Sequence, residues 1–197
     1  MAEWLAKCIV LLGAGIGIVF WYLAFRLYSR MQTLPGKLSG SAVMAGRDIT
    51  AGMKELVSFV ATHGRAHIVG KTPTALELKL GGADFSYFFV KIAACFESRA
   101  GAAVFHTEAD FQKVDKPFKI VMAVLVFFVM PLAILGIPLA VWLLAVPASA
   151  PAVRWQVVQV VQIVNFIWEP FVLYAIHRRY RMMGQAFLDN VTAVVTA

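Results

Sequence analysis

The residues best suited to chemistry in this sequence lie in one otherwise apolar stretch, residues 153–176. Its polar side chains are Gln156, Gln159, Gln162, Asn165 and Glu169. At 100° per residue, Gln162, Asn165 and Glu169 share one helix face, and Gln159 lies at its edge. A carboxylate at membrane depth costs a few kcal/mol, so such a residue normally faces a partner or a cavity. The face is therefore a candidate site.

Three kinds of interaction are open to this polar face. In an ion or proton path, Glu169 would be the titrating group and the amides would line the path. In a contact between helices, the same groups would hydrogen-bond across the interface. Contact with lipid head groups is the third alternative. The other apolar stretches offer no charged partner, so we favour a contact between helices or with a partner chain, through Gln159, Gln162, Asn165 and Glu169.

No other pattern in the chain predicts a reactive site. His63 and His67 are four residues apart, but Gly64 separates them and no further ligand pattern accompanies them. The glycines of GAGIG lie inside an apolar stretch without a preceding strand, so they do not make a phosphate loop. We expect no catalytic residue, no metal and no cofactor, and we predict that the protein is not an enzyme. The sequence identifies no cofactor-binding residues and no family motif.

Three segments are long and apolar enough to cross a bilayer, which takes about 20 apolar residues. They are residues 8–25, 120–146 and 153–176, in a chain that is 60% hydrophobic. We expect an N-terminal transmembrane helix within residues 1–33, a folded domain at 34–117, a transmembrane hairpin at 118–180 and a C-terminal tail at 181–197. Gly13 and Gly17 have the spacing that permits close helix approach.

Basic residues gather at the ends of these segments and predict the orientation. They are Arg26 and Arg30 after the first, Lys116 and Lys119 before the second, and Arg178, Arg179 and Arg181 after the third. The positive-inside rule places the N-terminus outside and the domain and C-terminus in the cytoplasm, which suits an integral protein of the bacterial inner (plasma) membrane. We expect these residues to act as membrane-surface anchors. The net charge of +7 is concentrated there, so we expect no nucleic-acid partner.

Residues 34–117 have the pattern of a small α+β domain. A linker at 34–40 precedes an amphipathic helix at about 41–63, whose apolar positions are Ile49, Met53, Leu56, Val57 and Val60. Strands are expected at 65–70, 74–80, 85–97 and 103–109, joined by short turns as an antiparallel meander with the helix on one face. The strand at 85–97 has large side chains on both sides, so we expect its second face to be covered as well.

The predicted architecture is an integral membrane α-helical protein of three transmembrane helices with a small α+β cytoplasmic domain of one helix and about four antiparallel strands. The predicted function is that of a non-enzymatic subunit, which anchors or stabilises a larger membrane assembly through its third span and its domain. The alternative is a membrane protein that binds or handles a lipid or another hydrophobic small molecule. Its partners would be the lipid bilayer and other membrane chains, in a homo- or hetero-oligomer.

Overall fold

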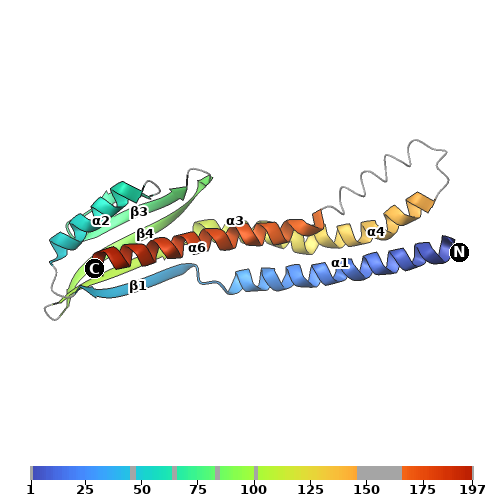
Figure 1. Ribbon diagram of the computed structural model, residues 1–197, viewed down its shortest axis with the longest axis horizontal. Helices are drawn as coiled ribbons and strands as arrows, with labels where there is room; N and C mark the ends of the chain where they lie inside the picture. Colours follow the sequence, from blue (N-terminus) through green and yellow to red (C-terminus); the bar gives the residue numbers. More distant parts are fainter. Residues whose placement is uncertain are drawn as a thin grey trace. The chain divides into compact units, whose positions relative to one another are not determined.

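The computed structural model describes residues 2–44, 48–63, 66–82, 85–99, 102–145 and 166–196 (Figure 1). The chain forms two compact units. The helical unit consists of Met1–Leu34 and Phe118–Ile176, and the sheet unit consists of Pro35–Pro117 and His177–Ala197. The chain thus passes from one unit to the other three times.

The helical unit is built from long apolar helices. The helices of the chain that contribute to it are α1 (Ala2–Thr33), α3 (Gln112–Val124), the π-helix η1 (Leu125–Val129), α4 (Met130–Ala145), the 3-10 turn η2 (Phe166–Trp168) and α6 (Glu169–Thr196). By length and composition, two segments could cross a membrane: Leu11–Thr33 and Gln112–Gly136. They correspond to the first two predicted spans. Residues 153–165 of the third predicted span lie outside the described part of the chain.

Pro170 lies at the start of α6. The 3-10 turn η2 comes directly before it, and Glu169 and Pro170 form the beginning of the new helix. Proline is tolerated there because the first turn of a helix has no intrahelical acceptors for its N–H groups. The same turn suits the Glu169 carboxylate, because the N-terminal end of a helix dipole favours negative charge.

Helix α1 packs closely on the segment formed by η1 and α4. A Cβ atom at Gly17 would lie 2.9 Å from Ile134 Cγ1, so a larger residue would push the two helices apart. This is the close approach that the glycine spacing predicts, and it is confirmed for Gly17. The Phe127 ring makes edge contacts with the rings of Phe25 and Tyr28, at centroid distances of 6.2 and 5.3 Å.

A hydrogen bond from Trp21 compensates for an irregularity in the second apolar helix. In the π-helix η1 the Met130 N–H donates to the Leu125 carbonyl instead of the Val126 carbonyl, which it would reach in an α-helix. The following residue is Pro131, which has no N–H to offer. The indole Nε1–H of Trp21 donates to the Val126 carbonyl at 2.9 Å. The tryptophan thereby replaces the missing intrahelical donor.

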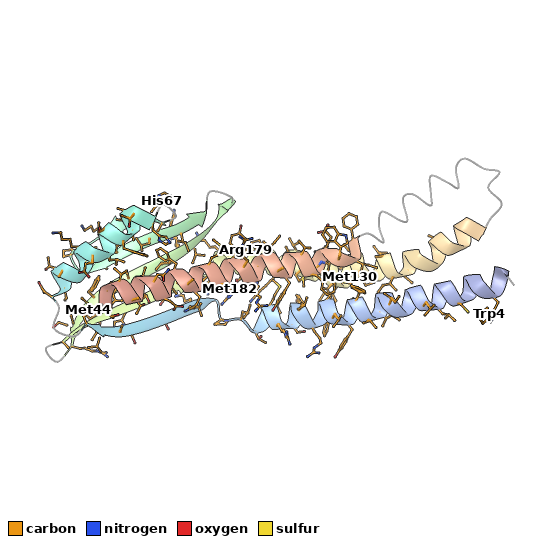
Figure 2. The ribbon with its side chains drawn as sticks, viewed as in Figure 1. Trp4, Met44, His67, Met130, Arg179 and Met182 are labelled. Carbon is orange, nitrogen blue, oxygen red and sulfur yellow. The ribbon has the colours of Figure 1, made fainter. Side chains whose placement is uncertain are left out.

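The outer surface of α1 is apolar and exposed. Trp4, labelled in Figure 2, is 70% exposed, and Leu11 and Leu12 are 73% and 67% exposed. Further exposed large side chains on the same helix are Ile16, Ile18, Val19, Phe20, Trp21, Tyr22, Leu23 and Phe25. A continuous apolar surface of this kind marks contact with a membrane or with another protein.

The sheet unit contains five antiparallel strands where the sequence predicted about four. They are β1 (Lys37–Met44), β2 (Ala66–Lys71), β3 (Ala75–Gly82), β4 (Phe85–Arg99) and β5 (Ala102–Asp110), in the order β1-β5-β4-β3-β2. The predicted meander is confirmed for the last four. The predictions of a linker at 34–40 and of a helix beginning at about 41 are wrong. Residues 37–44 form β1, because this short Ser- and Gly-rich segment pairs along its whole length with β5, far away in sequence.

Helix α2 (Ile49–His63) covers one face of the sheet. Of the five apolar positions predicted for its inner face, Met53, Leu56 and Val60 are buried. Gly52 allows α2 to approach the sheet, since a Cβ atom there would lie 3.1 Å from Phe96 Cε1 and would overlap the end of Met44. On the sheet, buried and exposed residues alternate along the strands. The fully buried residues of the covered face include Leu76, Leu78, Ile92, Phe96 and Phe105.

The C-terminal part of α6 is the second helix of the sheet unit. Residues 181–197, assigned above to a tail, bury Phe187, Leu188, Val191 and Val195. The ring of Phe187 packs on those of Phe59 and His63 in α2, with centroid distances of 5.9 and 5.1 Å. The tail is thus an integral layer of the domain.

Candidate functional site

The predicted polar face is described only at Glu169. Its side chain is half-buried in the first turn of α6. Gln159, Gln162 and Asn165 lie outside the described residues, so the continuous polar face stays a prediction.

The predicted membrane-surface anchors differ in their surroundings. Arg26, Arg30, Lys116, Arg178 and Arg179 are exposed, whereas Lys119 is half-buried. Arg181 is directed into the sheet unit, where it forms an ion pair. Attachment of these residues to lipid head groups stays a prediction.

The strongest polar constellation within the described residues centres on Asp115. Asp115 is 3% exposed and His177 is 0% exposed, and the Arg181 side chain is 11% exposed. His177 Nε2 lies 2.8 Å from Asp115 Oδ1, and Arg181 Nη1 donates to Asp115 Oδ2 at 2.6 Å. Because a carboxylate only accepts, the His177 Nε2 atom carries the proton of this bond. We call Asp115, His177 and Arg181 the Asp115 cluster.

The Asp115 cluster joins all three segments at which the chain enters or leaves the sheet unit. Arg181 Nη2 donates to the Pro35 carbonyl at 2.8 Å, next to the first passage at residues 34–35. Asp115 lies two residues before the second passage, and His177 is the first residue after the third. One carboxylate and one guanidinium therefore hold together three segments that are distant in sequence.

Aromatic packing fixes the guanidinium of Arg181. Its Cζ atom lies 4.8 Å from the centroid of the Phe111 ring, at cation–π distance. Gly184, one turn further along α6, leaves room for this ring, since a Cβ atom there would lie 2.6 Å from Phe111 Cζ. Both oxygens of Asp115 are occupied by these donors, and the charges of Asp115 and Arg181 balance. The arrangement is suited to holding segments together and not to transferring a proton.

The sequence interpretation did not find the Asp115 cluster. It placed Arg181 among the surface anchors and gave Asp115 no role. Two signals were present: Asp115 is an acid among Lys113, Lys116 and Lys119, and His177 and Arg181 are four residues apart, on one face of a helix. The contact itself spans more than 60 residues, which local patterns do not encode.

The other face of the sheet is open and charged. Lys91, Ala93, Glu77 and Glu108 are exposed there, and Cys95 is half-buried. We predicted that the second face of the strand at 85–97 is covered. The described residues of this chain do not cover it. The side chains of Tyr87 and Phe89 lie outside the description. An open hollow on this face is lined by β3, β4 and β5.

An ion pair at the edge of this face has a testable consequence. Lys37 Nζ lies 2.5 Å from Glu108 Oε1, and this hydrogen bond and the charge of Glu108 raise the pKa of Lys37 above its ordinary value of 10.5. The pair therefore stabilises the folded chain below that ordinary pKa, and its contribution is lost as the pH rises through the raised value. We expect the Lys37 Cε NMR signal to titrate at lower pH in Glu108→Gln than in the unaltered chain. Glu97→Gln is the control, and equal titration in all three proteins would contradict the pairing.

The described residues contain no group of three or more His, Cys, Asp or Glu side chains placed to hold a metal ion. Comparisons with protein-family models, curated proteins and solved structures gave no match for the chain.

Proposed function

We propose that this protein is a non-enzymatic integral membrane subunit that anchors or stabilises a larger membrane assembly. It would contact the other chains of this assembly through its third span, residues 153–176, and through its sheet domain. In this proposal the N-terminus lies outside a bacterial inner membrane, and the domain and the C-terminus lie in the cytoplasm. The exposed apolar surface of α1 and the length of Gln112–Gly136 support a place in the bilayer.

The observation that favours a subunit over a lipid carrier is the packing of the covered face of the sheet. A carrier of this architecture would need open space between the sheet and its helices. There, Phe96 and Phe105 are 2% and 1% exposed, and their rings pack at a centroid distance of 4.9 Å. Leu56 of α2 and Val191 of α6 are fully buried in the same layer. This layer is filled by the chain itself, which leaves the outer face of the sheet for other molecules.

Purification of the full chain in a mild maltoside detergent, followed by mass spectrometry, tests the proposal. We expect one or more identified membrane chains at fixed stoichiometry. Gln162→Leu and Asn165→Leu should each reduce the bound partner about tenfold, the loss of roughly one interhelical hydrogen bond. Leu135→Ala, on the exposed surface of α4, is the control and should leave the partner bound.

Other outcomes are equally informative. A bound lipid at fixed stoichiometry without protein partners would support the carrier alternative instead. A bare monomer would contradict both functions. Glu169→Gln tests the alternative that Glu169 is the titrating group of an ion or proton path. Unchanged assembly and activity in this variant would remove any role in proton handling.

A further inference from the structure

The hollow on the outer face of the sheet has a floor of one small residue, Ala93. Ala93 lies on the central strand β4, between Glu77 of β3 and Glu108 of β5 in the register of the sheet. Longer side chains rise around it, and the alanine leaves the space between them open. The lining is charged on both sides of this floor.

On one side, the hollow has a pair of lysines directly opposite each other. Lys79 of β3 pairs with Lys91 of β4 in the antiparallel register, where Cβ atoms are about 5 Å apart. Like charges in this position repel each other. Within the described ranges, neither ammonium group lies within ion-pair distance of a carboxylate. Asp110 of β5 lies opposite Lys91 on its other side, so this row carries one excess positive charge, which an anion between the two lysines would neutralise.

Directly beside Ala93, on the two neighbouring strands, the hollow is acidic. Glu77 and Glu108 flank Ala93 on the neighbouring strands. Their row lies two residues along the strands from the lysine pair, a distance of about 6.8 Å. Glu108 is already bound to Lys37, whereas Glu77 is exposed and forms no ion pair with a described residue. Glu77 is therefore a carboxylate available to a cation.

We propose that this hollow binds a small zwitterion, with its phosphate or carboxylate group between Lys79 and Lys91 and its ammonium group at Glu77, above Ala93. A simple anion is disfavoured by the carboxylates of Glu77 and Asp110, and a simple cation by the two lysines. A molecule with both charges, spaced by a few bonds, matches both sides. Free phosphoethanolamine and the head group of a phospholipid share this chemistry. The proposal does not depend on the role as a membrane subunit.

Calorimetric titration of the full chain in maltoside detergent tests this binding. We expect phosphoethanolamine to bind at least tenfold more tightly than inorganic phosphate or ethanolamine, because only the zwitterion engages both sides of the hollow. Lys91→Gln and Glu77→Gln should each weaken binding about tenfold, the effect of one charge-assisted hydrogen bond. Ala93→Leu should abolish it by filling the hollow. The control, Lys54→Gln, alters an exposed lysine on α2 and should bind normally.

The source of the ligand is distinguished by a second titration, with nanodiscs that contain phosphatidylethanolamine or only phosphatidylglycerol. Binding that needs phosphatidylethanolamine identifies a lipid head group, and binding of free phosphoethanolamine alone identifies a soluble zwitterion. Failure of both would overturn the proposal. So would equal affinity for inorganic phosphate, or unchanged affinity in both Lys91→Gln and Ala93→Leu, whose folding is checked by circular dichroism.

Discussion

Replacing Asp115 by alanine should lower the free energy of unfolding of the sheet unit by about 3–5 kcal/mol, because it leaves the buried charge of Arg181 without its partner. Hydrogen-exchange mass spectrometry of the full chain in detergent measures the effect locally. Amides of β1 and of the C-terminal half of α6 should exchange about a hundred- to a thousandfold faster, since each 1.4 kcal/mol corresponds to a factor of ten. Arg181 of α6 donates to Asp115 of α3 and to the carbonyl of Pro35, two residues before β1.

The control for this prediction is Lys113→Ala, an exposed substitution two residues away in the same helix. It should leave exchange unchanged. In the double variant Asp115→Ala/Arg181→Ala, the free energy of unfolding should fall by less than the sum of the decreases in the two single variants. Removal of both partners leaves no unpaired charge. Exchange rates in Asp115→Ala equal to those in Lys113→Ala would show that the cluster does not hold the unit together.

Phe96→Ala should destabilise the sheet unit by a similar amount, about 3–5 kcal/mol, through the cavity left between the sheet and α2. Phe96 is 2% exposed, contacts Phe105 and lies under Gly52. The amides of β4, β5 and α2 should lose protection by about two orders of magnitude or more. Glu97→Ala changes the next residue, which points to the open face, and serves as the control. Similar protection in both variants would contradict the assignment of the two faces.

The parts of the fold that the sequence predicts are those with a local pattern. Apolar and charged residues alternate at 74–80, where Leu76 and Leu78 are buried, and the helical spacing of Met53, Leu56 and Val60 gave the inner face of α2. Both patterns arise because burial repeats with the period of the backbone. The two apolar segments that are long enough to cross a membrane could likewise be recognised from composition alone, without knowledge of contacts.

The parts that escaped prediction depend on contacts between distant residues. Strand β1 has little strand propensity of its own, and it forms because its backbone pairs with β5. Asp115 and His177 are 62 residues apart, so no local sequence pattern predicts their hydrogen bond. The C-terminal residues read as a tail for a similar reason. Their apolar side chains find their partners only in the assembled domain.

The hydrogen bond between Trp21 and Val126 bears on the order in which the chain is made. A carbonyl without a donor is costly in hydrocarbon, and Pro131 creates such a carbonyl in the second apolar helix. The donor belongs to α1, which leaves the ribosome about 100 residues earlier, because synthesis runs from the N-terminus. In a bilayer, α1 would already be in place when residues 112–136 arrive, and would offer its indole to the incoming helix. In that setting, the first helix would supply the donor that the second lacks at the moment of its insertion.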